Sequence, residues 1–264
     1  TYTYKIMKTL YKRLIAIPMV VFCSMLLFTS CEDFLAEKPY DFYDEQDFYK
    51  DVSELELAVN GAYEVLSQKM TYGHFMLVND CDTDLSHIKG SGTGHTARDL
   101  GHYNIYTSHN WLEEAWGYYY TGIDRVNRIM ANKERVDLPD EASQVTFKRL
   151  IAEARLLRGI CYFDLVRMWG DVPLKLTASD KTENFAVTRT NREEVYQQIV
   201  DDMEAAVTDL PWYNEVSSYE GRPTKGAAMG LLARAYLFRA GYSLHQNGEM
   251  ERPDNLSLIH ISEP

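Results

Sequence analysis

The residues best suited to ligand chemistry in this chain gather in one long polar stretch, 72–109, which is rich in histidine and glycine. A connection of this length in a compact domain is usually functional or disordered. Aromatic rings can stack on the C–H faces of sugars, and planar amide, carboxylate or guanidinium groups can bond to sugar hydroxyls. Both kinds occur here, and the candidate ligand-binding residues are Tyr72, His74, Asp82, His87, Arg98, Tyr103 and, at the exit of the stretch, Trp111. Each of them taken singly also fits a solvated loop residue or an aromatic that caps a helix.

Alternating carboxylates at Asp80, Asp82 and Asp84 resemble the start of a calcium loop, but the pattern excludes an EF-hand. Leu85 stands where that motif needs a glycine for its turn, and Ser91 where it needs a bidentate glutamate. A single calcium ion outside an EF-hand stays open as an alternative. The histidines of the stretch form neither an HExxH pair nor a cysteine-histidine finger spacing, so no metal site is predicted.

Common catalytic motifs do not occur in the sequence. The stretch 221–226 has glycine and lysine in the reverse order of a phosphate-binding loop and no hydrophobic strand before it, so it predicts a helix start. No serine occupies a nucleophile-elbow pentad, and Cys161 falls on a buried helix face. Acidic pairs are frequent in this chain, so their number does not exclude the pair of carboxylates that a glycosidase needs. The acidic clusters, however, fall on helix flanks and caps, where charge is normally solvated. We therefore predict a protein that is not an enzyme, with no catalytic residue and no cofactor.

The charge of the chain restricts its partners. Asp and Glu number 39 against 27 Lys and Arg, which gives a formal net charge of −12 at pH 7. Such a surface repels phosphate backbones, so no nucleic acid is expected as a partner. A hydrophobic content of 45% over 264 residues is enough for a large core.

The N-terminal segment is organised as an export signal. Basic residues begin it, an apolar run occupies 14–28, and small polar residues directly precede Cys31. The run contains Pro18 and is shorter than the roughly 20 residues that span a bilayer. A membrane-anchoring helix is the alternative. Cys81 and Cys161 either form a disulfide in an oxidising compartment or stay free thiols.

Five amphipathic helices are predicted from apolar residues that recur every three or four positions. Their expected starts are a capping box of Ser53 with Glu56, Asn110, the stretch from Phe147, a box of Thr190 with Glu193, and Thr224. The third helix should end at Gly170, and its buried face consists of Leu150, Ala154, Leu157, Cys161, Leu165 and Met168. Trp116 lies on the apolar stripe of the second helix and is assigned to the core. Small residues in the fifth helix predict the close approach of another helix.

Four segments, taken together and in this order, resemble the SusD/RagB family of Bacteroidetes outer-membrane lipoproteins. They are CEDFLAEKP at 31–39, WGYYYTGIDRVNRIM at 116–130, EARLLRGICYFDLVRMWGDVPL at 153–174 and GRPTKGAAMGLLARAYLF at 221–238. The resemblance implies a mainly all-α fold, in which tetratricopeptide-like helical hairpins form a scaffold and long loop insertions carry the binding surface.

The same resemblance implies a function and a location. Thr29-Ser30-Cys31 resembles a lipobox, in which Cys31 is lipidated, and the acidic pair after it resembles a surface-export signal. The expected location is therefore the outer membrane, lipid-anchored and facing the exterior. Family resemblance further implies that the protein binds an oligosaccharide or polysaccharide and delivers it to a SusC-like TonB-dependent transporter.

The expected domain boundaries are a signal peptide at 7–30, a lipid-anchored tether at 31–52, a SusD-like helical domain at 53–255 and a non-native tail at 256–264. Family members are longer, so the chain is interpreted as an N-terminal fragment. Two alternatives remain: a secreted glycan-degrading enzyme whose catalytic half is missing, and a helical-repeat adaptor that binds another protein. The adaptor predicts that Tyr103→Ala and Trp111→Ala leave sugar retention unchanged.

Overall fold

The computed structural model describes residue 7 and the segments 48–73, 83, 85, 87–90, 96–179, 187–216, 221–244 and 248–252. The predicted signal peptide (apart from Met7), Cys31 and most of its tether, His74, Cys81, Asp82 and the predicted tail therefore lie outside the described residues. The chain divides into two compact units, Thr1–Asp44 and Glu45–Pro264, and all the described segments except residue 7 belong to the second.

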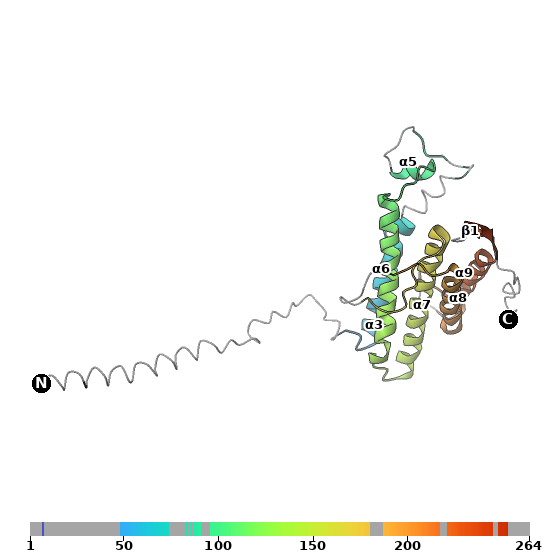
Figure 1. Cartoon of the computed structure of the whole chain (residues 1–264). Helices are drawn as coiled ribbons and strands as arrows, with labels where there is room; N and C mark the ends of the chain where they lie inside the picture. Colours follow the sequence, from blue (N-terminus) through green and yellow to red (C-terminus); the bar gives the residue numbers. More distant parts are fainter. Residues whose placement is uncertain are drawn as a thin grey trace. The chain divides into compact units, whose positions relative to one another are not determined.

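The described part of this unit is built from long helices, as predicted (Figure 1). They are α3 (Val52–Tyr63), α6 (Asn110–Asn132), α7 (Glu141–Trp169), α8 (Arg192–Asp209) and α9 (Lys225–Arg239). Short helical turns accompany them: η1 (Glu64–Ser67), η2 (Lys69–Gly73), α5 (Thr96–Gly101), η4 (Lys133–Arg135) and η5 (Tyr213–Glu215). Two-residue strands β1 (Ser243–Leu244) and β2 (Met250–Glu251) pair antiparallel after α9. The part of the chain described here has no helix that is both long and apolar enough to cross a membrane.

The predicted capping box of α3 is wrong. Asp51 caps the helix by accepting the Glu54 N–H at 2.9 Å, and the Glu54 carboxylate accepts the Lys50 N–H at 2.8 Å. Asp and Ser are comparable N-caps, so local preference does not choose between them. The choice follows from tertiary structure, because the Lys50 carbonyl accepts the Asp137 N–H and holds the entering chain extended up to Asp51.

Two other helix starts differ from the prediction. Asn191, not Thr190, caps α8 by accepting the Glu193 N–H. Thr190 pairs with Val172 in an isolated β-bridge, which keeps it outside the helix. Helix α7 begins six residues earlier than Phe147, after Asp140, whose carboxylate accepts the Ser143 N–H at 2.7 Å. Its end is as predicted.

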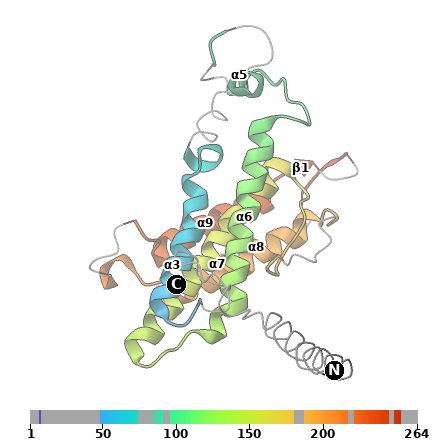
Figure 2. The same ribbon diagram turned by 90° about the vertical axis from the view of Figure 1, so that its left-hand side faces the viewer.

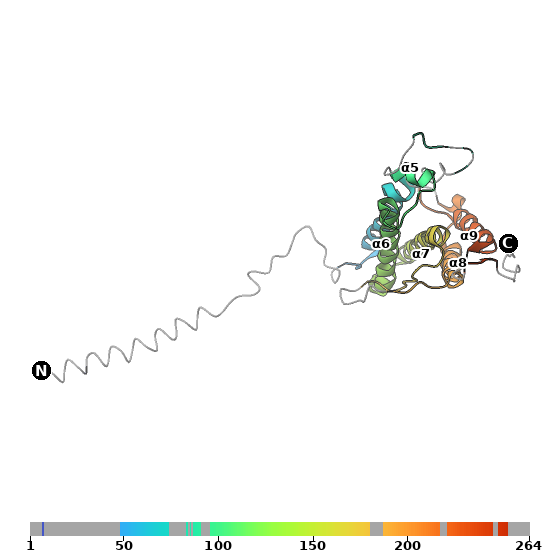
Figure 3. The same cartoon turned by 45° about the horizontal axis from the view of Figure 1, so that its top comes forward.

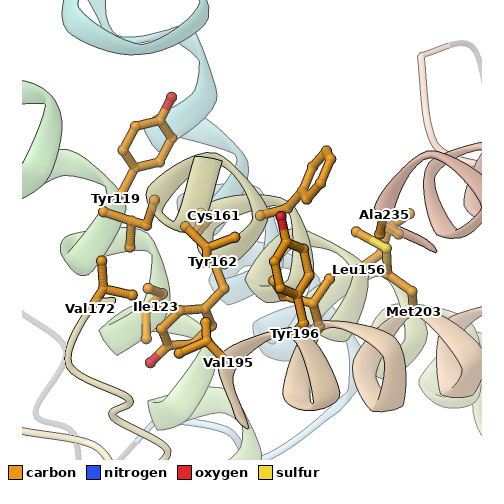
Figure 4. Packing of buried hydrophobic residues seen from close by; sticks show 14 of the residues in the cluster. Tyr119, Ile123, Leu156, Cys161, Tyr162, Val172, Val195, Tyr196, Met203 and Ala235 are labelled. Carbon is orange, nitrogen blue, oxygen red and sulfur yellow. The ribbon is translucent and has the colours of Figure 1, made fainter. Parts of the chain in front are cut away.

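Helix α7 lies at the centre of the unit, with α3 and α6 packed on one side and α8 on the other (Figures 1 and 3). Figure 2 shows α3 and α6 side by side, and α9 packs mainly on α8. The predicted face of α7 is buried, except that Met168 is half-buried. Burial extends well beyond that face, because neighbours cover the helix on several sides. Figure 4 shows one of the resulting apolar clusters, in which Tyr162 of α7 lies among Ile123 and Val195 from the adjacent helices.

Burial of α7 also encloses charged side chains, and each finds a partner on a neighbouring element. The Glu153 carboxylate, which is 0% exposed, accepts from Arg149, from the Tyr63 hydroxyl at 3.0 Å and from Arg222 at 2.7 Å. Arg158 donates two bonds of 2.8 Å to Asp202. These contacts tie α7 to α3, to the start of α9 and to α8, since an unpaired charge in this interior would be costly.

The small residues of α9 only partly behave as predicted. Ala228 and Ala235 are buried where α9 meets α8, which agrees with close packing. Gly226, Ala227 and Gly230 are exposed instead. Some of the small residues therefore pack against α8, and the others lie on the exposed surface of α9.

After α7 the chain runs in extended form along α6, and side chains of α6 hold it there. The Asn127 amide donates to the carbonyls of Lys175 and Thr177, both at 3.0 Å. The Asp124 carboxylate accepts the Ser179 N–H at 2.7 Å. Desolvation raises the pKa of Asp124, but the bonds from Ser179 and from Arg128 outweigh it and lower that pKa below its ordinary value.

We expect Asp202→Ala to lower the free energy of unfolding by about 3–5 kcal/mol, because it leaves the Arg158 guanidinium buried without its carboxylate. The matched control is Glu134→Ala, which removes an 87% exposed partner of Lys133 at 3.9 Å and should cost about 1 kcal/mol or less. Urea denaturation measures both. Equal losses in the two variants would contradict the importance of the buried pair.

The lowered pKa of Asp124 predicts a pH-dependent contribution to stability. A carboxylate with a lower pKa in the folded state stabilises the fold fully above its unfolded pKa, and that contribution disappears as the pH falls. The melting temperature of wild type should therefore exceed that of Asp124→Asn near neutral pH, and the difference should shrink between about pH 5 and pH 3. A difference that stays constant over this range would refute the assignment.

Candidate functional site

An open hollow of about 570 Å³ lies beside the first turns of α6 and the last residue of α7. We call it the aromatic hollow, and it is lined by Ile105, Tyr106, Thr107, Leu112, Glu113, Trp116 and Trp169. Trp116 and Trp169 meet edge to face, with ring centroids 5.4 Å apart and an interplanar angle of 81°. The two rings come from different helices, so the packing of α6 on α7 creates this part of the site.

The connection from α5 to α6 supplies the other side of the hollow. At the end of α5, the His102 N–H donates to the Arg98 carbonyl at 2.9 Å, and the Asn104 N–H donates to the Asp99 carbonyl at 2.8 Å. Tyr103 then takes a positive φ of 58°, an uncommon conformation for a non-glycine residue. The chain turns there, and the His109 N–H donates to the Tyr106 carbonyl just before α6 begins. These backbone bonds fix the position of the exposed residues 105–107.

The exposure of these side chains suggests ligand binding. Tyr106 is 43% exposed and Tyr103 is 71% exposed, although both carry large aromatic rings. Grouped exposed apolar side chains commonly mark binding surfaces. Glu113 is exposed at the hollow and adds a carboxylate that can accept hydrogen bonds. Aromatic rings beside a hydrogen-bond acceptor can hold a hydroxylated ring with an apolar face.

The structure separates the predicted ligand residues into groups. His87 stacks on His102, with ring centroids 5.1 Å apart, and His102 lies 3.0 Å from the Ile88 carbonyl oxygen. Arg98 lies against Gly90 so closely that a Cβ there would be 2.8 Å from its guanidinium nitrogen. These contacts hold residues 87–90 against α5 and the residue that follows it. Tyr103 is exposed and precedes Ile105, the first residue of the hollow's lining, by two positions. The ligand-binding role of His87, Arg98 and Tyr103 stays a prediction.

Two further predicted residues contact the helices. Trp111 is half-buried, and the Lys69 ammonium lies 5.7 Å from the centre of its ring. The Tyr72 hydroxyl donates to the buried Asp164 carboxylate at 2.7 Å. Burial and the Asp164 charge raise the pKa of Tyr72, so its hydroxyl stays protonated as a donor. The geometry therefore gives Tyr72 a structural contact in addition to its predicted role.

Sequence reasoning missed most of the aromatic hollow. Trp116 packs against the core, as assigned, but it is only half-buried and also lines the hollow. Trp169 comes from the end of the third predicted helix, and a tryptophan directly before the terminating Gly170 was the available signal. Tyr106 and Glu113 lie in or next to the predicted loop, but nothing in their spacing distinguishes them from their neighbours.

The described residues contain no group of three or more His, Cys, Asp or Glu side chains that could hold a metal ion. Cys161 is a buried free thiol whose pKa is raised by burial and by Asp164. A protonated, enclosed thiol is not a reactive nucleophile.

Comparison with known proteins identifies relatives that match most of the chain. A SusD-like family model, described as starch-binding and associating with the outer membrane, matches residues 33–237. A SusD-like protein of Bacteroides ovatus is 30% identical over 248 residues, covering 91% of this chain and 42% of that protein. The SusD-like protein P2 of Formosa agariphila is 26% identical over 220 residues, covering 83% of this chain and 42% of its own length.

Solved structures agree with this result. A SusD homologue from Bacteroides thetaiotaomicron matches with a TM-score of 0.69 and 29% identity, over 77% of this chain and 39% of that one. A laminarin-binding SusD-like protein matches with a TM-score of 0.62 and 26% identity, over 73% of this chain and 41% of its own. The chain thus spans about two fifths of the length of these relatives. Because the family model matches most of the chain and the helices superpose on solved members, the protein belongs to the SusD-like family, whose scaffold is tetratricopeptide-like.

Proposed function

We propose that this protein is a cell-surface glycan-binding lipoprotein that captures oligosaccharides in the aromatic hollow and delivers them to a SusC-like TonB-dependent transporter. One observation carries the binding step: Tyr106, Trp116 and Trp169 line a single open hollow together with the Glu113 carboxylate. Family membership supports carbohydrate as the ligand, since the family is described as starch-binding and one structural neighbour as laminarin-binding.

The chemistry of the hollow suits reversible binding. Sugar rings present C–H faces to aromatic side chains, and their hydroxyls can donate to a carboxylate such as Glu113. A neutral ligand is also compatible with the net charge of −12, because it experiences no repulsion from the acidic surface. The proposal includes no covalent step, so the protein acts without catalytic residues.

The proposed location is the outer face of the outer membrane. The family description associates its members with the outer membrane. Acylation of Cys31 would anchor the chain, and a lipoprotein that carries several acyl chains is held more stably than one with a single chain. Under this proposal the helical unit faces the exterior, where polysaccharides are available.

Tyr106→Ala should weaken binding about tenfold, which corresponds to the roughly 1.4 kcal/mol expected for losing an aromatic contact. The measurement is affinity electrophoresis and calorimetry with a panel of polysaccharides that includes laminarin and starch. Tyr213→Ala removes another strongly exposed tyrosine, located outside the hollow, and serves as the matched control.

Other outcomes favour the alternatives. Release of reducing ends during incubation would indicate a glycan-degrading enzyme. A wild-type protein that retains no polysaccharide of the panel would contradict the proposed function and favour the adaptor.

Tyr72→Phe should leave polysaccharide retention unchanged but reduce the free energy of unfolding by about 1–3 kcal/mol, because the buried Asp164 loses a hydrogen-bond donor. The control Tyr236→Phe removes a hydroxyl that donates to the exposed Glu204 at 2.8 Å and should cost less. Thermal denaturation and affinity electrophoresis on the same samples separate the two effects. Lost retention at unchanged stability would place Tyr72 in the ligand site, as the sequence predicts.

A further inference from the structure

A second cavity, of about 560 Å³, lies between the middle of α6 and the extended segment that follows α7. We call it the α6 cavity. Its lining consists of residues on one side of α6, residues of the extended segment and Val187: Trp116, Gly117, Tyr120, Thr121, Ile123, Asp124, Asn127, Pro173, Lys175, Thr177, Ser179 and Val187. The volume falls in the range of small-molecule sites, about 300–1,000 Å³.

The wall of this cavity is held in place by buried polar groups. Asn127 is 2% exposed, and its amide holds the extended segment by donating to the carbonyls of Lys175 and Thr177. The amide oxygen of Asn127 in turn accepts a bond of 2.8 Å from Arg158. The Tyr120 hydroxyl donates to the Pro173 carbonyl at 2.7 Å. Protein interiors normally pack without large voids, yet between these direct contacts of the segment with α6 the α6 cavity stays open. A site with rigid walls binds with a smaller ordering cost than one formed by a mobile loop.

The chemistry of the lining matches a sugar ring. Trp116 and Tyr120 contribute aromatic surface, with ring centroids 5.0 Å apart. Thr177 and Ser179 contribute hydroxyls that can both donate and accept hydrogen bonds, and the Thr121 hydroxyl, which donates to the Gly117 carbonyl at 2.8 Å, can still accept one. The Lys175 ammonium lies 3.3 Å from the Ser179 hydroxyl, which keeps both groups at the cavity. An apolar wall with several hydroxyls suits a compact, uncharged polyol.

Trp116 connects this cavity to the aromatic hollow. It lines both spaces, and among the described residues it is the one that the two linings share. A glycan that passes Trp116 can therefore place the units on one side of this ring in the hollow and the units on its other side in the α6 cavity.

We propose that the α6 cavity is a second sugar-binding subsite, so that the protein holds a glycan of several units across Trp116. This inference rests on the proposed glycan-binding function. It adds a requirement for ligand length, because only an oligosaccharide that is long enough reaches both spaces.

The test fills the cavity without disturbing the fold. Gly117 lines the α6 cavity, lies in a regular helix, and has no atom within 4 Å of where its Cβ would be. Gly117→Leu should therefore occupy the cavity. The matched control is Gly230→Leu in α9, which also has open space at its Cβ. Both changes replace glycine inside a helix, so neither should lower the melting temperature.

The ligands are size-fractionated oligosaccharides, prepared by partial hydrolysis of the polysaccharide that wild type retains most strongly in the panel. Wild type should bind longer oligosaccharides about tenfold more tightly than the disaccharide. Gly117→Leu should lose this gain while Gly230→Leu keeps it, and disaccharide binding should stay equal in all three proteins.

The outcomes distinguish this inference from the proposed function. If Gly117→Leu keeps the full length-dependent gain while Tyr106→Ala loses binding, the second subsite is wrong and the proposed function stands. If wild type retains no polysaccharide of the panel, both are wrong. A lower melting temperature in Gly117→Leu than in Gly230→Leu would show that the cavity cannot accept a side chain, and would overturn its description as an open site.

Discussion

Enclosure of α7 by its neighbours is the constraint on which the rest of the structure depends. A helix covered on several sides would ordinarily be apolar all round, but this one carries Glu153, Arg158 and Asp164 in its buried surface. Each charge must meet a partner, since isolated buried charges are strongly destabilising. The partners come from different elements, so satisfying the charges also sets where α3, α8 and the start of α9 lie.

These ionic contacts specify arrangement more than they add stability. Replacing a buried ion pair by apolar residues is often neutral or stabilising, whereas removing one partner is costly. Arg222 illustrates the point, because it bonds Glu153 at 2.7 Å and also Glu56 at 2.7 Å, joining residues far apart in sequence. An apolar contact at the same place would tolerate sliding of α3 along α7. The directional guanidinium bonds do not.

The same network reaches the proposed binding surfaces. Arg158 fixes Asn127, and Asn127 carries the extended segment that forms one wall of the α6 cavity. Asp164 holds Tyr72 of η2, which precedes the predicted binding loop. Scaffold and sites are therefore physically continuous. Loops on a rigid helical frame are a common arrangement for binding proteins, and here the frame itself also provides Trp116 and Trp169.

The sequence by itself determined the long helices, the buried face of the third one and the family. Those features depend on local periodicity, on Gly170 at a positive φ and on motifs that stay together in the chain. Tertiary structure decided which N-caps are used, because Lys50 and Thr190 are held by residues distant in sequence. It also decided the aromatic hollow, where Trp169 meets Trp116 from another helix. Periodicity reports that a side chain is apolar and on a given face, but only the packing of neighbours determines whether that face is covered or left open to a ligand.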